Sequence, residues 1–218
     1  MRLRLSLRLL AVCAALQFTP AFAEEKKADD GFTPLFNGKD LSGWKTFFAT
    51  KDADPAKTLT VKDGVLHCNG KPNGYFYTEK SFKNYVIRYD WRYPAEQPEK
   101  TTLNSGLLVH IKEPHKVWPN CIEAQGRYMD HGKIYFMGFS KDAKKESKDD
   151  DAARKKALKP KEEWHTTEMT CNADGTIVVK INGIEVASGK SELTEGPIGF
   201  QSEGAAIDFR NIRIKELK

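Results

Sequence analysis

The chain has 218 residues, of which 39% are hydrophobic, 30% charged and 11% aromatic, a composition typical of one globular domain. Its apolar runs are shorter than the roughly 18 residues that a membrane-spanning helix needs, which excludes an integral membrane protein of that kind. The formal net charge is +5, and no segment repeats at the roughly 20- to 50-residue period of a solenoid or propeller.

The first 23 residues have the pattern of an export signal. Three arginines precede an apolar stretch from Leu9 to Phe18, and the segment ends with small residues up to Ala23. This order predicts a secreted or periplasmic protein that is cleaved after Ala23. A lipoprotein signal that uses Cys13 is the alternative. It fits less well, because Val12 is bulkier than the residue usual before a lipidated cysteine and the apolar stretch before it is short.

Cleavage after Ala23 would remove three arginines and leave 32 basic against 30 acidic residues, a formal charge of +2. A near-neutral domain without a basic stripe argues against nucleic acid as a partner. Cys68, Cys121 and Cys171 remain, and an odd number of cysteines outside the cytoplasm permits at most one disulfide, whose pairing stays open. No cysteine or histidine spacing in the sequence is typical of a zinc site.

Beyond a polar leader from Glu24 to Asp30, which we expect to be disordered, short alternating runs are separated by Gly, Asn, Asp and Pro. The expected strands, in chain order, are Thr58–Val61, Val65–Cys68, Tyr75–Thr78, Tyr85–Tyr93, Ser105–Ile111, Cys121–Gln125, Lys133–Phe136, His165–Cys171, Thr176–Ile181, Ile184–Ala187, Ile198–Gln201 and Ile207–Lys215. Asn182-Gly183 predicts a tight hairpin, because both residues tolerate positive φ. The pattern predicts an all-β fold of two packed antiparallel sheets, a sandwich or jelly roll.

A charged stretch from Lys141 to Glu163 interrupts this pattern. It holds nine Lys or Arg and seven Asp or Glu with hardly any large apolar side chain, so we expect a surface excursion that cannot contribute to a core. One helix, from Asp149 to Leu158, is predicted within it. A binding tail is the functional alternative to a solvated face.

Alternate residues of a strand face opposite sides of its sheet, so polar residues can be sorted by face. The alternation puts His110 on the face of Leu108, and Glu123 on the face of Gln125. Polar residues gathered on such faces are Arg88, His110, Glu123, Gln125, Gln201 and Glu203. On a curved sandwich these faces can form the concave surface that binds a sugar; an ordinary solvated sheet face is the alternative. The tyrosines at 75, 77 and 85 are candidates for stacking on sugar rings.

Several familiar catalytic patterns are missing from the sequence. Retaining glycosidases on β sandwiches often carry two carboxylates within one strand, about 5 Å apart, but Glu123 is followed by Ala124 and Gln125. A Gly-x-Ser-x-Gly elbow and an HExxH helix are also missing, so serine-esterase and zinc-protease functions have no support.

Several segments taken together resemble one family. They are GFTPLFNGKDLSGW at Gly31–Trp44, NSGLLVH at Asn104–His110, CIEAQ at Cys121–Gln125, EEWHTTEMTC around Trp164, INGIEV at Ile181–Val186 and GPIGFQSEGAAIDFRNIRIKEL at Gly196–Leu217. In this order they are similar to the 3-keto-disaccharide hydrolase domain family. The resemblance implies a concanavalin A-like jelly roll in secreted carbohydrate metabolism. It also implies cleavage of glycosides whose ring is already oxidised to a ketone at carbon 3.

A ketone acidifies the neighbouring C–H, so a base can remove that proton and expel the glycosidic oxygen without a paired nucleophile. One carboxylate then suffices, which suits Glu123. Under this hypothesis Glu123 or His110 is the base, and a divalent cation, if one binds near Glu123, polarises the ketone. The alternative is a non-catalytic carbohydrate-binding module on the same face.

The resemblance carries over residue by residue. Asn104, Glu123, Gln125 and Gln201 match the family's Asn-Ser-Gly, Glu-x-Gln and Gly-x-x-Gln motifs, and Arg88 and Glu203 are added as ligand-binding candidates from their strand faces. Many members have Arg where this chain has His110, Asp near Tyr128, and His where Glu203 stands. Substrate identity, and activity itself, can therefore differ from those of other members.

Overall fold

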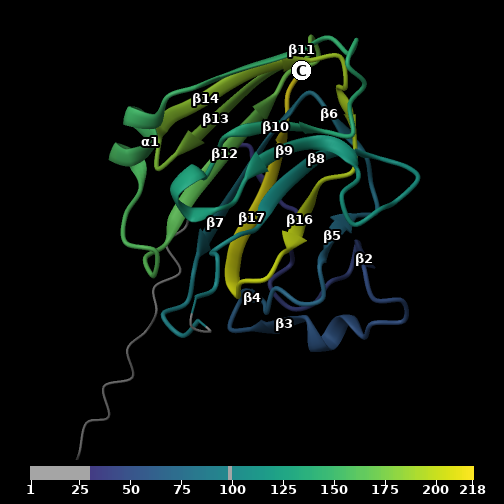
Figure 1. Cartoon of the computed structure of the whole chain (residues 1–218), viewed down its shortest axis with the longest axis vertical. Helices are drawn as coiled ribbons and strands as arrows, with labels where there is room; N and C mark the ends of the chain where they lie inside the picture. The colour runs from purple at the N-terminus through teal and green to yellow at the C-terminus, as the bar shows by residue number, and fades with distance from the viewer. Residues whose placement is uncertain (1–29, 98–99) are drawn as a thin grey trace, which may run out of the picture. The chain divides into compact units, whose positions relative to one another are not determined.

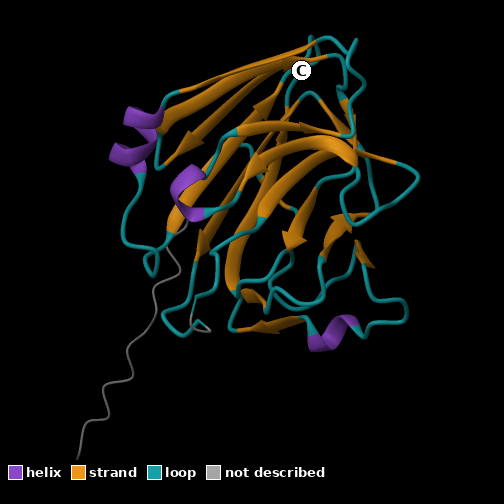
Figure 2. Ribbon diagram, viewed as in Figure 1, coloured by secondary structure: helices purple, strands orange, loops and turns teal. Residues whose placement is uncertain are grey.

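Strands that alternate apolar and polar side chains need a second layer to cover their apolar face. The computed structural model describes residues 30–97 and 100–218, and it packs two antiparallel sheets face to face (Figures 1 and 2). The predicted export signal, and the polar leader apart from Asp30, lie outside the described residues. The unit from Gly31 to Lys218 is compact and is described below.

The larger sheet has the C-terminal strand in its interior, between two strands from the first half of the chain. Its strands lie in the order β11 (Lys145–Asp149), β14 (Ile184–Ser191), β13 (Thr176–Ile181), β12 (His165–Cys171), β7 (Tyr85–Arg92), β17 (Ile207–Glu216), β4 (Val65–Cys68) and β3 (Leu59–Lys62). The short strand β1 (Thr33–Pro34) also pairs with β17.

The smaller sheet covers the other side of the core. Its strands lie in the order β10 (Ile134–Met137), β9 (Asn120–Gln125), β8 (Gly106–Lys112), β16 (Gly199–Ser202), β5 (Gly74–Thr78) and β2 (Trp44–Phe48), while β15 (Glu195–Gly196) and β6 (Phe82–Lys83) form a separate pair. The helical elements of the described residues are α1 (Asp151–Ala157) and the 3-10 turns η1 (Pro55–Lys57) and η2 (Tyr128–Asp130). No helix in this part of the chain is long and apolar enough to cross a membrane.

The main core lies between the sheets and is rich in aromatic rings. Tyr89 on β7 and Phe209 on β17 each contact Phe200 on β16, with ring centroids 4.9 Å apart in both pairs. All three side chains are almost fully buried. Because burial of one large apolar side chain contributes about 1.5–3 kcal/mol, these contacts hold the two sheets together.

The predicted fold class is confirmed, and each predicted strand overlaps an observed one. Asn182 and Gly183 have φ angles of 49° and 82° and connect β13 to β14, as the hairpin signal predicted. The strands that were not predicted are β2, β11 and the two-residue strands β1, β6 and β15. The charged strand β11 is exposed at the edge of its sheet, so it carries no alternation of apolar residues.

The charged stretch is more ordered than the sequence predicted. Its strand β11 pairs with β14, and the Asp150 side chain caps α1 by accepting from the Ala153 N–H at 2.8 Å. Arg154 is only 1% exposed and Ala157 belongs to the main core, although most of the stretch is exposed. The expectation that this stretch cannot contribute to the core is therefore wrong at Arg154 and Ala157, and the partly buried Ala153 and Leu158 also pack against the core.

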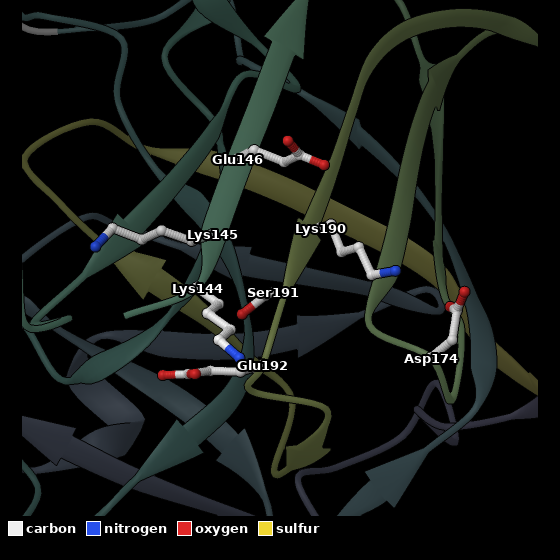
Figure 3. A pocket seen from close by; sticks show the side chains of 7 residues that line it. All are labelled: Lys144, Lys145, Glu146, Asp174, Lys190, Ser191 and Glu192. Carbon is white, nitrogen blue, oxygen red and sulfur yellow. The ribbon is translucent and has the colours of Figure 1, made fainter. Parts of the chain in front are cut away.

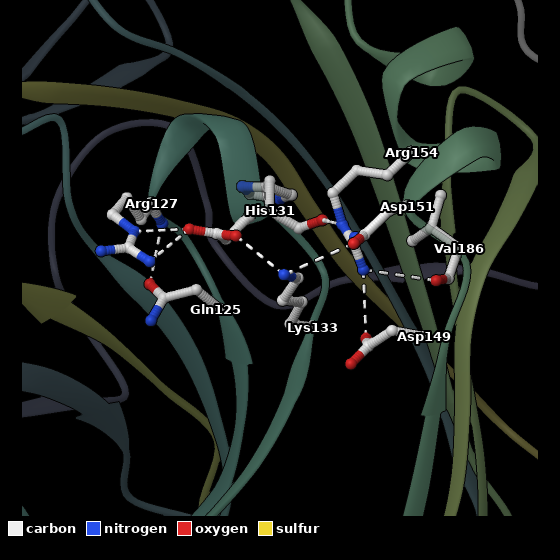
Figure 4. A network of polar contacts seen from close by, with 9 residues as sticks. Gln125, Arg127, His131, Lys133, Asp149, Asp151, Arg154 and Val186 are labelled. Carbon is white, nitrogen blue, oxygen red and sulfur yellow. Dashed lines mark hydrogen bonds and ion pairs between the residues drawn. The ribbon is translucent and has the colours of Figure 1, made fainter.

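A network of polar contacts explains why a charged side chain can be buried there (Figure 4). Arg154 Nε donates to the His131 carbonyl oxygen at 2.9 Å, its Nη2 pairs with Asp149 at 3.1 Å, and its Nη1 contacts Asp151. Lys133 extends the network from Asp151, at 3.4 Å. A buried guanidinium is tolerated when its N–H groups find such acceptors, and the network holds α1 against the sheets.

Trp91 on β7 lies between two buried histidine rings. Its ring centroid is 3.9 Å from that of His131 and 4.2 Å from that of His165, with nearly parallel planes. Trp91 Nε1 donates to Thr167 Oγ1 at 2.9 Å, and His131 Nε2 lies at the same distance from that hydroxyl. Burial lowers the pKa of His131 to about 3 and lowers the pKa of His165, so both rings are neutral at pH 7.

The three cysteines at 68, 121 and 171 are buried free thiols. The single disulfide that their odd number permits is therefore not formed among them.

Candidate functional site

Glu123 lies in the smaller sheet, on the face that points away from the main core. Its neighbours along β9, Ile122 and Ala124, belong to the main core, so strand alternation turns Glu123 outward. It pairs directly with Leu108 on β8 and with Tyr135 on β10. Glu123 is nevertheless only 5% exposed. A carboxyl group is thus held nearly dry on an outer sheet face.

Two neighbouring rows of side chains cross this face. Directly paired residues share a face with Cβ atoms about 5 Å apart, so the register defines each row. The first row contains Tyr135, Glu123, Leu108, Gly199, Tyr77 and Lys45. The second contains the pair Gln125 and Gly106, and the pair Gln201 and Tyr75. Strands far apart in the sequence therefore bring the Glu-x-Gln and Gly-x-x-Gln motifs to one place.

Gly106 makes room for two of these side chains. A Cβ atom at this position would lie 2.3 Å from Gln201 Oε1 and 2.5 Å from Glu123 Oε1, closer than such atoms can approach. The two side-chain oxygens therefore converge above the bare backbone of Gly106. Any larger residue would displace both.

Glu203 follows β16, and Asn104 precedes β8. Burial and, secondly, the charge of the nearby Glu203 carboxyl raise the pKa of Glu123 to about 8. Burial also raises the pKa of Glu203, and a side-chain hydrogen bond with Asn104 opposes that shift. Glu123 therefore keeps its proton at neutral pH and loses it in mildly alkaline solution. The structure thus brings together Asn104, Glu123, Gln201 and Glu203.

This group is rich in hydrogen-bond acceptors that lack donors. Asn104 Oδ1 and Gln201 Oε1 are buried and find no hydrogen-bond partner in the described part of the chain. An unpaired buried acceptor costs about 1–3 kcal/mol. Hydroxyl groups of a ligand would supply the missing donors, which is the chemistry that a sugar offers.

The side-chain oxygen atoms of this group also determine which type of cation could bind there. Mg²⁺ and Ca²⁺ prefer carboxylate and amide oxygens, which Glu123, Glu203, Gln201 and Asn104 provide. Zinc prefers histidine and cysteine ligands, and no group of three His, Cys, Asp or Glu side chains converges within the described residues. The side-chain oxygen atoms of this site are therefore of the type that a hard divalent cation prefers and zinc does not.

His110 does not lie beside Glu123, contrary to the sequence prediction. A bulge interrupts the pairing of β8 and β9 after Val109, and His110 has a φ of 57°. The bulge reverses the alternation, so the His110 ring packs edge-to-face against the ring of the core residue Tyr85, with ring centroids 5.8 Å apart. His110 Nδ1 lies 2.9 Å from the Leu193 carbonyl oxygen. Burial lowers the pKa of His110 to about 4. His110 is a neutral core residue, not a second base.

Arg88 also lies away from Glu123. Its strand β7 belongs to the larger sheet, so its polar face is the opposite outer surface of the sandwich. There Arg88 Nε donates to Glu168 Oε2 at 2.8 Å, and the guanidinium carbon lies 4.0 Å from the centre of the Phe32 ring. The prediction that Arg88 orients the ligand is corrected, because alternation identifies a face without showing which sheet the strand joins.

Gln125 lies on the Glu123 face, as predicted, but its Oε1 accepts from the Arg127 backbone N–H at 2.8 Å (Figure 4). Its amide N–H groups and the second lone pair of Oε1 remain for a ligand. Tyr128 lies where this chain departs from the family pattern, and its hydroxyl donates a hydrogen bond to the Lys159 carbonyl oxygen. That contact ties η2 to the end of the charged stretch.

The tyrosines proposed for stacking have different environments. Tyr85 is a core residue, and Tyr75 lies on the outer face but is fully buried, with its hydroxyl 2.8 Å from His115 Nδ1. Tyr77 is half-buried and, with His115 and Lys45, lines a hollow of about 380 Å³. Of these three tyrosines, only Tyr77 borders an open hollow.

Two residues of the site were missed by sequence analysis. A glycine within an alternating strand indicates a close approach of other atoms, and Gly106 carried that signal. Tyr135 is 42% exposed and faces the same side as Glu123, its direct partner. Alternation within the predicted strand from Lys133 would have placed it on the polar face.

Another hollow, of about 330 Å³, opens beside β11 and β14 of the larger sheet, away from Glu123 (Figure 3). It is lined by Lys144, Lys145, Glu146, Asp174, Lys190, Ser191 and Glu192. Figure 3 shows Lys190 directed toward Asp174 while Lys145 projects the other way. Its charged side chains are mostly exposed and alternate in sign, so the hollow lacks the dry, convergent groups found around Glu123.

The fold and the acceptor-rich site define a carbohydrate-active β-sandwich domain of the glycosyl hydrolase type. Residues 31–215 match the family described as the 3-keto-alpha-glucoside-1,2-lyase-like domain. The chain belongs to this family, which confirms the resemblance inferred from its motifs. No curated protein matches the chain in sequence.

Solved structures share this architecture. A "putative glycosyl hydrolase" from Parabacteroides distasonis ATCC 8503 is 25% identical, with a TM-score of 0.59 over 86% of this chain and 94% of that chain. The carbohydrate binding module CBM66 from Bacillus subtilis is 8% identical, with a TM-score of 0.53 over 81% and 98% of the two chains. A Bacillus licheniformis beta-glucanase is 13% identical, with a TM-score of 0.52 over 85% and 97%. The last two bear on the fold alone.

Proposed function

We propose that this domain cleaves α-glucosides that carry a ketone at carbon 3, by eliminating the group attached to carbon 1. The observation that carries the proposal is the Glu123 carboxyl, whose pKa of about 8 makes it a stronger base than an ordinary carboxylate. The family description supports the same reaction class.

In the proposed reaction, deprotonated Glu123 removes the proton from carbon 2, and the electrons of that C–H bond form an enolate with the ketone. The enolate then re-forms the ketone, a double bond forms between carbons 1 and 2, and the bond from carbon 1 to the glycosidic oxygen breaks. The leaving oxygen keeps the bonding electrons and takes a proton, which Glu123 returns after removing it from carbon 2. No oxidant is needed, because the ketone is already present.

The neighbouring groups hold the ring and its developing charge. Gln201 and Asn104 can accept from ring hydroxyls through their unpaired oxygens, or donate amide N–H groups to the enolate oxygen. Burial excludes water and strengthens each of these interactions. A divalent cation, if bound by the same oxygens, would supply further polarisation of the ketone.

A non-catalytic carbohydrate-binding module is the second candidate. The unpaired acceptors Asn104 Oδ1 and Gln201 Oε1 favour sugar binding whether or not a reaction follows. Cleavage of the ligand distinguishes the two functions.

The test compares 3-ketosucrose with sucrose as substrates of the purified protein, and the release of fructose is measured. Glu123→Gln keeps the size of the side chain and removes its basicity, so cleavage of 3-ketosucrose should fall by about 100-fold or more. Glu168→Gln, on the far face of the other sheet, is the matched control and should retain wild-type activity.

Full activity of Glu123→Gln would show that another group is the base. Binding of 3-ketosucrose without cleavage by the wild type would establish the binding module. Cleavage of sucrose would instead indicate a glycosidase that uses two carboxyl groups.

A further inference from the structure

Tyr135 presents a bare aromatic ring beside the candidate base. It pairs directly with Glu123 across β9 and β10, and it is 42% exposed. No other ring, hydrogen-bonding group or charged group of the described chain engages its side chain. The large apolar residues Leu108 and Tyr75 on the same face are fully buried, so Tyr135 differs from them in being open to a ligand.

The position of Tyr135 in the sheet strengthens this contrast. β10 is the edge strand of the smaller sheet, and edges are usually protected by charged or covered residues. A tyrosine ring offers a flat apolar surface with a polar tip. A pyranose ring is complementary, since it has an apolar C–H face and a rim of hydroxyl groups.

The dimensions agree with one sugar ring. Neighbouring strands are about 4.8 Å apart, so a ring resting on Tyr135 places its rim over Glu123 on the next strand. The unpaired oxygen of Gln201, which meets Glu123 above Gly106, lies on the same side of the sheet. Tyr135 would therefore contact the face of the sugar ring, while Glu123 and Gln201 would bind its hydroxyl groups.

We propose that Tyr135 is the stacking platform for the oxidised sugar ring and holds carbon 2 of that ring toward Glu123. This assignment of the ring rests on the proposed function, whereas the position of the platform rests on strand register and exposure alone. The ligand class is a pyranoside with an unsubstituted C–H face.

The experiment measures KM and kcat for 3-ketosucrose in Tyr135→Ala and Tyr135→Phe, and binding of 3-ketosucrose and sucrose by calorimetry in the Glu123→Gln background, where turnover is suppressed. Loss of one aromatic contact should raise KM and Kd about tenfold, while Phe retains most of the affinity. Thermal unfolding should change little in both variants, because the ring is exposed. Met129→Ala, which removes another exposed apolar side chain (65% exposed), is the control and should bind as the wild type does.

The outcomes separate the two proposals. If the wild type cleaves 3-ketosucrose and Tyr135→Ala retains its KM and Kd, the platform is wrong and the proposed function stands. If the wild type binds sugars without cleaving them and Tyr135→Ala weakens that binding, the proposed reaction fails and the platform stands. If neither sugar binds nor reacts, both proposals fail.

Discussion

At the Glu123 carboxyl, burial and a second carboxyl act in the same direction, and both oppose ionisation. The pKa of Glu123 is about 8 in the folded chain against 4.5 for an ordinary glutamate. Between these pH values the folded protein holds a proton that the unfolded chain releases, so folding stability falls as pH rises. Each pKa unit corresponds to about 1.4 kcal/mol. A strong base is therefore maintained at a cost in stability, which is common at reactive sites.

Replacement of the neighbouring Glu203 carboxyl tests what raises the pKa of Glu123. Glu203→Gln removes the negative charge that raises the pKa of Glu123, so that pKa should fall. If Glu123 acts as a base, kcat/KM for 3-ketosucrose should rise with pH around a midpoint near 8 in the wild type, and the midpoint should move to lower pH in the variant. Glu168→Gln serves as the control for removal of a distant carboxyl. An unchanged midpoint in Glu203→Gln would show that its charge does not act on the catalytic base.

The sequence identified some site residues and misplaced others for a local reason. Alternation along a regular strand correctly turned Glu123 and Gln125 away from the core. It failed at His110, because this residue has a positive φ and lies in a bulge of β8, which turns its side chain to the face opposite the predicted one. Such a bulge arises from pairing with the next strand, and a histidine gives little indication that its backbone will adopt this conformation.

Among the elements, α1 illustrates how a short helix of charged residues can be held in place. Its seven residues are too few for a stable isolated helix. The cap from Asp150, the contacts of Arg154 and the packing of Ala157 supply what its length does not. The sequence predicted a helix in this region, but composition alone could not show which of the nine basic residues of the charged stretch would be buried.

Removal of Arg154 should therefore destabilise the domain. Arg154→Met keeps much of the side-chain volume but leaves the His131 carbonyl oxygen and Asp149 without their partner, at a cost of about 3 kcal/mol. Lys155→Met, on the same helix and exposed, should change the free energy of unfolding by no more than about 0.5 kcal/mol. Denaturant unfolding measures both values. Equal stability of the two variants would mean that the network contributes nothing to folding.

For the whole molecule, the buried histidines predict sensitivity to acid. The pKa of His131 is about 3 in the folded chain against 6.5 for an ordinary histidine, so the unfolded state binds the proton first as pH falls. Stability from this group is fully present above pH 6.5 and is lost progressively toward pH 3. His131→Phe keeps an aromatic ring beside Trp91 and removes the titration. Its melting temperature should therefore fall less steeply than that of the wild type between pH 6.5 and 4, as measured by calorimetry. Identical slopes would contradict the role of His131.

The fold class followed from sequence because period-two alternation and turn residues are local signals. Strand neighbours are a different matter, since they depend on contacts between distant segments. Arg88 shows the consequence, because its polar face was read correctly while its strand was assigned to the wrong side of the sandwich. The sequence likewise did not indicate that Glu203 would raise the pKa of Glu123, because the two residues lie in segments far apart along the chain.

The interior position of β17 has a consequence for how the protein is made. Ribosomes synthesise β4 and β7 long before Ile207–Glu216, the segment that pairs with both of them. The larger sheet therefore cannot close until Ile207–Glu216 has left the ribosome, and the nascent chain keeps two unpaired strand edges until then. A premature stop codon just before Ile207 would leave a product that contains β4 and β7 but cannot complete its fold.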